Sequence, residues 1–423
     1  MTQHTGSRTE VIVIGGGYAG VLAANRLTRR DDVAVTLINP RPNFVERLRL
    51  HQLVAGTDDA VVDYEDVLSE RVHLVVDTAT EIDREARTVS LAGGATVGYD
   101  HLIYAVGSRS GGAPQVPGAD EFAYPIATLE EAERLREAVA AAPATAVLAV
   151  VGGGATGIET AAELAEAGRT VTLVCGGQLG SYLHPNGRRF VAKRLAALGV
   201  TVLEGPGAKA ASVTADAVHL ADGREVRAHL TIWAAGFGVP DLAARSGLST
   251  DETGRLLTDE TLTSIDDDRI VAAGDAAAPS GLAYRMGCQA AVQLGPHAAD
   301  AVLRRIEGGR PQAISIAFAG LCVSLGRGAG IFQFARKDDT AIRFHVGGRT
   351  GARLKELVVS HAVKQLSDEA RKPGARVLKA KDDARRQRVQ AAGTSANTRA
   401  AGTSTNTRAA STSASTNRPA RVS

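Results

Sequence analysis

Hydrophobic and polar positions form the same pattern at two places in the chain. Residues 11–14 and 147–151 are short apolar runs, and each is followed at once by a glycine cluster and an alanine-rich helical stretch. A second apolar run follows each of them, at residues 33–38 and 170–174. Strand, helix and strand in this order are typical of a parallel sheet, so we predict an α/β protein with two doubly wound domains.

The two glycine clusters have the same internal spacing. Both follow the order GxGxxG, with Gly15, Gly17 and Gly20 in the first and Gly152, Gly154 and Gly157 in the second. The first glycine permits a tight turn, the second lets the backbone approach a pyrophosphate, and the third lets the helix pack on the strand. The amides at the start of the helix then face the phosphates. One such motif is weak evidence, but two in a complete strand-helix-strand context predict two bound dinucleotides, commonly FAD and NAD(P)H.

The residue that binds the adenosine ribose is commonly acidic and lies at the end of the second strand. Both units depart from this rule. The first ends in Asn39, whose amide can still bond ribose hydroxyls, with Arg41 nearby for a phosphate. The second ends in Cys175, which removes a carboxylate that would repel a 2'-phosphate but brings no arginine directly after it. We interpret Cys175 as a small strand-end residue, and the choice between NADH and NADPH stays open.

Three further strands run into glycine, in the stretches YAVGS, WAAGF and AAGDAA. With GGGYAG and VVGGGATGIE they form an ordered set that resembles the two-dinucleotide flavoprotein family. This family includes type II NADH dehydrogenases, apoptosis-inducing-factor-like oxidoreductases and disulfide reductases. The resemblance covers residues 10–310 and extends weakly to residue 365.

The resemblance implies two sets of cofactor-binding residues. On the FAD side these are Gly15, Gly17, Ala19, Gly20, Asn39, Arg41, Arg47, Ala105, Gly107, Gly274 and Asp275. On the nicotinamide side they are Gly152, Gly154, Thr156, Gly157 and Gly236. Arg47, Arg49 and His51 form a basic cluster, one member of which could stabilise negative charge on reduced FAD.

The resemblance also implies an FAD domain interrupted by an inserted domain. We expect the FAD-binding domain at residues 1–125 and 241–310, the NAD(P)H-binding domain at 126–240, and a C-terminal interface region at 311–370. Residues 371–423 hold 12 Lys and Arg against 2 Asp, and they end in a near-repeat of small polar residues and arginine. Such a segment cannot bury enough apolar surface to offset its chain entropy, so we expect a disordered tail.

Cysteines and glutamines separate the branches of the family. Disulfide reductases carry redox cysteines in segments that have none here, and the surroundings of Cys288 and Cys322 do not match those of sulfide:quinone oxidoreductases. The segment GCQAAVQLGPHAADAV resembles that of type II NADH dehydrogenases, where two glutamines lie near flavin and quinone. Gln289 and Gln293 match, and their spacing puts both amides on one helix face. Pro296 follows them and could kink this helix.

Glu159 matches the family glutamate near the nicotinamide nucleotide, and we place it with Gln289 and Gln293 in the catalytic set. Glu159 could equally be a carboxylate that complements the helix dipole. No metal site or disulfide framework is indicated by the three cysteines.

The expected function is ping-pong transfer of a hydride from NAD(P)H to FAD and then of two electrons to a quinone-like acceptor. The alternatives are a soluble reductase with a ferredoxin-like protein acceptor and a redox-sensing flavoprotein similar to apoptosis-inducing factor. We expect no nucleic-acid partner, and the sequence does not decide between monomer and homodimer.

Composition bounds the location. With 44% hydrophobic and 22% charged residues, the composition is that of a globular protein. No apolar stretch approaches the roughly 20 residues that a membrane-spanning helix needs. Residues 1–10 lack the pattern of a signal peptide. Outside the tail, 36 Lys and Arg stand against 44 Asp and Glu. We therefore expect a cytoplasmic protein. The stretch GARLKELVVSHAVKQL and the basic linker after it are a candidate for peripheral contact with the inner face of the cell membrane, and the alternative is an ordinary C-terminal helix packed on the body.

Overall fold

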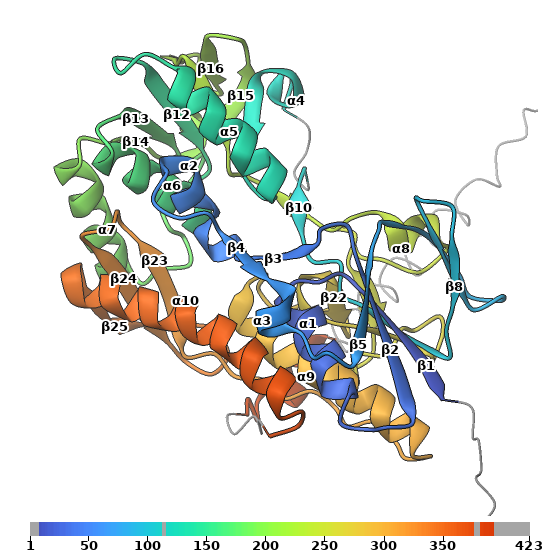
Figure 1. Ribbon diagram of the computed structural model, residues 1–423. Coiled ribbons are helices and arrows are strands. Elements are labelled where there is room, and N and C mark those ends of the chain that lie inside the picture. Colours follow the sequence, from blue (N-terminus) through green and yellow to red (C-terminus); the bar gives the residue numbers. More distant parts are fainter. Residues whose placement is uncertain (1–7, 112–115, 376–380, 393–423) are drawn as a thin grey trace, which may run out of the picture.

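Two parallel five-stranded sheets organise the computed structural model, which describes residues 8–111, 116–375 and 381–392 (Figure 1). The first sheet has the order β21-β9-β1-β2-β5 and consists of β1 (Thr9–Ile14), β2 (Val33–Asn39), β5 (Val72–Val76), β9 (His101–Tyr104) and β21 (Ile270–Ala272). The second has the order β11-β18-β12-β13-β14 and consists of β11 (Ala123–Pro125), β12 (Val147–Val151), β13 (Thr170–Val174), β14 (Thr201–Leu203) and β18 (Leu230–Trp233).

The second sheet is inserted into the chain of the first. Strand β21 follows all of the second sheet in sequence, yet it pairs in parallel with β9 of the first. The predicted α/β fold with two Rossmann-like units is therefore confirmed. The chain crosses between the units at β10 (Arg109–Ser110) and β19 (Phe237–Gly238), which pair antiparallel. The first crossing lies earlier than the predicted boundary at residue 126, because β11 already pairs with β18.

Smaller antiparallel units are attached to these sheets. Two have three strands, namely β6 (Ala79–Asp83), β7 (Thr88–Leu91) and β8 (Thr96–Gly98), and β15 (Ala210–Val213), β16 (Ala217–Leu220) and β17 (Glu225–Arg227). Strands β3 (Asn43–Val45) and β4 (Val61–Asp63) form an antiparallel pair, whereas β20 (Leu256–Thr258) and β22 (Ala277–Pro279) pair in parallel.

Helices α1 (Tyr18–Leu27) and α6 (Ala155–Glu166) start directly after the two glycine clusters. The other helices are α2 (Leu50–Ala55), α3 (Tyr64–Val67), α4 (Ala119–Phe122), α5 (Leu129–Ala141), α7 (Pro185–Ala197), α8 (Leu242–Arg245), α9 (Cys288–Ile306) and α10 (Gly348–Arg371). Helix α9 runs through Pro296 as one helix. Among the described residues, no helix is both long and apolar enough to cross a membrane.

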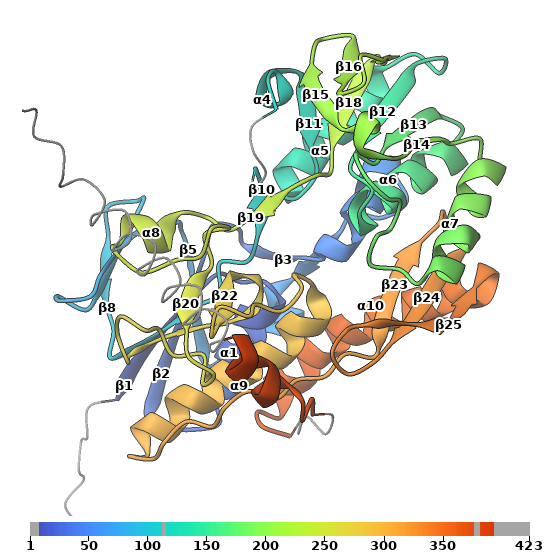
Figure 2. The same cartoon turned by 180° about the vertical axis from the view of Figure 1, so that it is seen from behind.

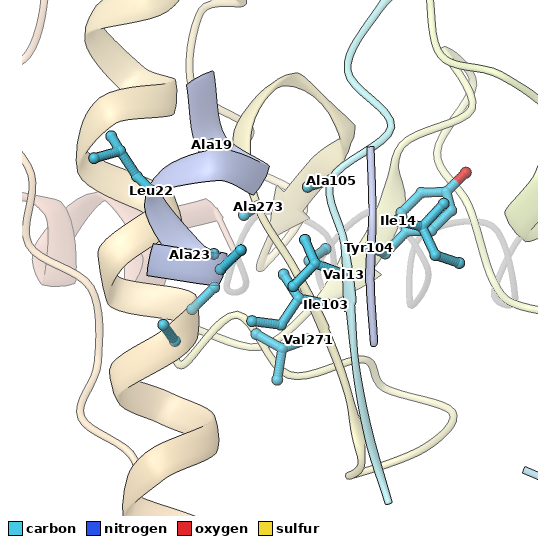
Figure 3. Packing of buried hydrophobic residues seen from close by; sticks show 14 of the residues in the cluster. Val13, Ile14, Ala19, Leu22, Ala23, Ile103, Tyr104, Ala105, Val271 and Ala273 are labelled. Atoms are coloured by element: carbon cyan, nitrogen blue, oxygen red, sulfur yellow. The ribbon is translucent and has the colours of Figure 1, made fainter. Parts of the chain in front are cut away.

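The core of the first domain lies between its sheet and helices α1 and α9. Figure 3 shows Ala23 of α1 on the side of Val13, Ile103 and Val271, which come from three neighbouring strands, while Leu22 points to the other side, toward α9. All five side chains are almost fully buried. Helix α9 approaches α1 closely because Gly295 has no side chain, and a Cβ there would overlap the backbone of Ala19.

The C-terminal part adds a third sheet and a long helix. Strands β23 (Gly320–Ser324), β24 (Gly330–Ala335) and β25 (Ala341–Gly347) form an antiparallel sheet, and α10 packs on β24 and on α1. Arg26 of α1 is 7% exposed and pairs with Asp300 of α9 at 2.9 Å and with Glu369 of α10 at 3.2 Å. This arginine therefore fixes α10 to the first domain.

Residues 381–392 also pack on the body, as the dark red piece in Figure 2. Arg385 makes a bidentate pair with Glu260, donates to the carbonyl oxygens of Pro279 and Leu282, and lies 4.1 Å from the ring of Tyr284. The expectation of disorder from residue 371 onward is thus wrong for this stretch. Composition alone does not reveal that Arg385 has partners on the body. The near-repeat from residue 393 lies outside the described residues.

We predict that Gly295→Ala lowers the free energy of unfolding by about 1–3 kcal/mol, because the new methyl group would press on the backbone of Ala19. Urea unfolding measures the loss. Gly177→Ala is the matched control, since a Cβ there meets nothing within 4 Å. Equal losses in the two variants would contradict the steric explanation.

Candidate functional site: a cleft shared by both dinucleotide domains

A cleft of about 940 Å³ is lined by both Rossmann-like units and by the C-terminal part. Its wall includes the residues that follow β1, β9 and β21 in the first sheet, the start of α6, the start of α9, and part of α10. The carboxyl ends of parallel strands, where the strand order reverses, are the usual ligand site of such sheets. The cleft is therefore the candidate site.

The first glycine cluster leaves room for a phosphate. Gly15 has a φ of +104°, and a Cβ there would overlap the carbonyl of Ala105. A Cβ at Gly20 would overlap the carbonyl oxygen of Gly15, so the third glycine lets α1 pack on its strand as predicted. A Cβ at Gly17 would meet nothing within 4 Å. Helix α1 has no acidic residue in its first turn and no side-chain cap, so its amides can receive an anion.

Asp275 lies at the base of this part of the cleft. Its Oδ2 accepts a hydrogen bond from Ser108 Oγ at 2.7 Å, and its Oδ1 accepts one from Gly287 N at 2.8 Å. Arg47 donates to the same Ser108 Oγ at 3.1 Å and to the carbonyl oxygen of Ala127 at 3.1 Å. Asp275, Ser108 and Arg47 therefore form one hydrogen-bonded chain along the cleft. The predicted residues Ala19, Ala105, Gly107 and Gly274 also line the cleft.

Asn39 and Arg41 already have protein partners. Asn39 is 8% exposed, accepts from Gly16 N at 2.9 Å and donates to the carbonyl oxygen of Arg41 at 2.8 Å. Its amide thus holds the glycine turn, with one donor and one lone pair left for a ribose. Arg41 makes a bidentate pair with Glu130, and these hydrogen bonds lower the pKa of Glu130 to about 2. FAD binding by these two residues stays a prediction.

The second glycine cluster repeats this geometry. Gly152 has a φ of +132° beside the carbonyl of Ala234, a Cβ at Gly157 would overlap the carbonyl oxygen of Gly152, and a Cβ at Gly154 would meet nothing within 4 Å. Helix α6 likewise has no acidic residue in its first turn. Thr156 lines the cleft. Gly236, with a φ of +70°, follows β18 in the stretch WAAGF. Both fingerprints can therefore hold a pyrophosphate.

Glu159 is the polar centre of the wall between the domains. It is 7% exposed, its Oε1 accepts from Lys355 Nζ at 2.7 Å and from Ser324 N at 2.9 Å, and its Oε2 lies 3.8 Å from His51 Nδ1. Glu159 comes from α6 of the inserted domain, His51 from α2, and Lys355 from α10. Glu159, His51 and Lys355 all line the cleft.

The ionisation of this group follows from its burial and its charges. Burial alone would raise the pKa of Glu159, but Lys355 and His51 outweigh burial, and its pKa is lowered. Burial would lower the pKa of Lys355, yet Glu159 raises it. Burial lowers the pKa of His51 to about 4, so its ring is neutral near pH 7. His51 Nε2 is buried with no hydrogen-bond partner in the described part of the chain, and it can bond a ligand in the cleft.

Sequence reasoning missed Lys355. The residue lies in a buried stripe of α10 with Gly351, Val359, Ala362 and Leu366, at spacings of three or four residues. A lysine within an otherwise apolar helical stripe was the signal that could have revealed it. Arg49, by contrast, was grouped with Arg47 and His51 but pairs with Glu46 and Glu356 and does not line the cleft.

Gln289 and Gln293 lie on one face of α9, as predicted. Gln293 donates to the carbonyl oxygen of Ala317 at 3.2 Å and accepts from Ala317 N at 3.3 Å. The Gln289 amide, oriented to satisfy its neighbours, donates to the carbonyl oxygen of Gly320 at 2.9 Å and accepts from Ala319 N at 3.1 Å. Both glutamines line the cleft. They fix the segment before β23 to α9, and a catalytic role for them stays a prediction.

The cleft also contains two thiols, Cys288 and Cys322. Burial raises the pKa of Cys288 to about 12 and that of Cys322 to about 11, so both are protonated near neutral pH. Cys175 follows β13 beside Gly153, and burial raises its pKa to about 12. A thiolate is the reactive form of cysteine, so none of the three is activated in this protein environment.

The sequence matches a known family model. The model of the pyridine nucleotide-disulphide oxidoreductases matches residues 9–301. An NADH dehydrogenase-like protein of Mycobacterium tuberculosis is 32% identical over 299 residues, which cover 64% of this chain and 73% of that protein. A type II NADH:quinone oxidoreductase of Staphylococcus epidermidis is 25% identical over 407 residues, which cover 85% of this chain and 96% of the relative.

Solved structures agree on the fold. The NDH2 of Plasmodium falciparum in complex with NADH superposes with a TM-score of 0.72 at 16% identity, covering 86% of this chain and 97% of that one. The sulfide:quinone oxidoreductase of Aquifex aeolicus also gives a TM-score of 0.72, at 20% identity, with 85% and 92% covered. At identities this low, the superpositions establish the shared fold alone.

We predict that Glu159→Gln lowers the free energy of unfolding by about 3 kcal/mol, because it leaves the Lys355 ammonium buried without a carboxylate. Since the pKa of Glu159 is lowered by folding, its contribution is full above the ordinary pKa of a glutamate and is lost as pH falls through the lowered value. The difference between wild type and variant is therefore constant near neutral pH and shrinks only in acid.

Denaturant unfolding across the pH range measures this difference. A double variant, Glu159→Gln with Lys355→Met, is the control and should recover most of the loss, because it removes the unpaired charge. A double variant as unstable as the single one would show that the loss does not come from the unpaired charge.

Proposed function

Because the chain belongs to the pyridine nucleotide-disulphide oxidoreductase family, we propose that it is an NAD(P)H:quinone oxidoreductase. The family binds FAD and NAD(P)H, and the two glycine clusters fit one dinucleotide each. Bound FAD supplies the chemistry of accepting a hydride and releasing two electrons. The chain itself supplies binding, orientation and charge.

One observation carries the proposal. The cleft does not end at the two glycine clusters but continues along the start of α9 and the segment 317–322 to α10. Leu357 and Val358 of α10 line its far part and are 65% and 39% exposed. The far part thus offers apolar contacts that open to the outside, as a planar apolar acceptor requires. The curated relatives named as NADH:quinone oxidoreductases support the same acceptor class.

Lys355 gives the far part of the cleft a fixed positive charge. Its raised pKa keeps the ammonium protonated near neutral pH. A quinone gains negative charge on its oxygens as it takes up electrons, and a preorganised ammonium in a water-poor site stabilises such charge. Glu159 holds Lys355 in place, and the neutral His51 offers a ring N–H or lone pair beside them. These are the roles that we propose for the three residues.

Exposed apolar side chains of the C-terminal part support a location at a membrane. Besides Leu357 and Val358, Phe344 of β25 is 60% exposed, while the opposite stripe of α10 packs on the body. We propose that α10 both packs on the body and lies at the inner face of the cell membrane, where a lipid-soluble quinone could enter the cleft.

Anaerobic stopped-flow reduction of the FAD-loaded protein tests the function. We expect NADH or NADPH to bleach the flavin absorbance and a short-chain quinone to restore it within the steady-state turnover time. Steady-state rates should then give parallel double-reciprocal lines, as ping-pong transfer requires. Bleaching without reoxidation by quinone would contradict the proposal and favour a protein acceptor or a redox sensor. A protein that binds no flavin would overturn it altogether.

The two cleft thiols provide a second test. We predict that the double variant Cys288→Ser with Cys322→Ser keeps NAD(P)H:quinone turnover within about threefold of wild type, because both thiols are protonated at neutral pH and serine is nearly isosteric. Steady-state assays with a short-chain quinone measure the rate. Cys175→Ser, outside the cleft lining, is the control. A loss of a hundredfold or more confined to the cleft variant would show that the thiols carry electrons.

A further inference from the structure

A second cavity, of about 350 Å³, adjoins the cleft at Lys355. It is lined by the turn Ser324–Gly328 between β23 and β24, by the first turns of α10, and by Gln52 of α2. Lys355 lines both cavities, whereas Glu159 lines the cleft. No residue assigned above to a cofactor or an acceptor faces this second cavity, apart from Lys355.

The charges around the cavity are unbalanced. Arg349 and Arg353 line it, and neither has a carboxylate partner among the residues described here. Arg327 lies 3.8 Å from Glu356, but Glu356 is already paired with Arg49. The charge of Lys355 is met by Glu159. Arginines at i and i+4 near a helix start repel each other and the helix dipole, so an anion at this place would relieve both costs.

Gln52 contributes a neutral donor to the cavity. The residue is 2% exposed and its Oε1 accepts from Arg49 at 3.0 Å. Its Nε2 has no acceptor in the described residues, although this side chain lines the cavity. This N–H group keeps some contact with solvent, so it can donate to an acceptor atom in the cavity.

The cavity is formed before any ligand arrives. The turn is held by Glu166 of α6, whose carboxylate accepts from the backbone N–H groups of Arg327 and Gly328. At its other end Ser324 N donates to Glu159 at 2.9 Å. Glu166 is the last residue of α6, and the nucleotide fingerprint stands at the first. A helix of 12 residues is about 18 Å long, so the turn lies well away from the pyrophosphate site.

We propose that this cavity binds a phosphate group, with Arg349, Arg353 and Arg327 as cationic donors and Gln52 Nε2 as a neutral one. Planar guanidinium groups match phosphate oxygens in pairs, and the single carboxylate in the lining, Glu356, is already paired with Arg49. The phosphate can belong to a small soluble molecule or to a lipid headgroup. Both sources present the same doubly bonded and charged oxygens to the site.

The test uses the full-length, FAD-loaded protein with excess NAD⁺ and NADP⁺, so that the phosphate sites of both fingerprints are filled. Inorganic phosphate is titrated calorimetrically, and binding to vesicles of phosphatidylcholine, with or without phosphatidylglycerol, is measured by co-sedimentation. The variant is Arg349→Gln with Arg353→Gln. The control is Arg134→Gln with Arg136→Gln, two exposed arginines of α5 that remove the same charge elsewhere.

We expect the cavity variant to weaken binding by roughly tenfold for each arginine, and the control to leave it unchanged. Calorimetric binding of phosphate that the variant loses identifies a soluble source. Sedimentation that needs phosphatidylglycerol and is lost in the cavity variant alone identifies a lipid. Without ligand, the variant should melt no lower than wild type, because it removes a repulsion. Absence of both kinds of binding, or equal binding by variant and control, overturns the proposal.

Discussion

The buried ion pair between Glu159 and Lys355 joins the inserted domain to the C-terminal part at the cleft. Two charges taken out of water lose several kcal/mol of hydration each, and only close pairing with further hydrogen bonds recovers this loss. Here the recovery needs α6 of the inserted domain, α10 of the C-terminal part and the backbone of Ser324 at the end of β23. The pair is therefore satisfied only when the inserted domain is docked on the C-terminal sheet.

This dependence fixes the shape of the cleft. Arg26 ties α10 to α1 through Asp300 and Glu369, and the amides of Gln289 and Gln293 tie α9 to residues 317–320. Helix α10 presents Lys355 to the cleft, and α2 presents His51. A preorganised charge stabilises a reacting group better than one that must move into place, because no reorganisation is needed when charge develops. The contacts that stabilise the docked parts are thus the contacts that position the polar groups of the cleft.

The sequence predicted what depends on local geometry. The glycines at 15, 17 and 20 and at 152, 154 and 157 are required by turn conformation and close packing within a few residues, and a spacing rule captures them. Lys355 and Arg385 could not be recognised in this way. Each has its carboxylate partner more than a hundred residues away in the chain, and nothing in its own neighbourhood specifies that partner. The placement of Cys288 and Cys322 in one cleft also follows from the docking of β23 beside α9, which single-sequence patterns do not encode.

The two Rossmann-like units use their strand-end residues differently, and this bears on the choice of nucleotide. In the first, Asn39 accepts a hydrogen bond from Gly16 N and so stabilises the glycine turn. In the second, Cys175 stands at the equivalent place beside Gly153, with its pKa raised by burial to about 12 and therefore no charge at neutral pH. An acidic residue here would favour a free ribose hydroxyl, and an arginine would favour a 2'-phosphate. A neutral thiol does neither, so the strand end itself does not discriminate between NADH and NADPH.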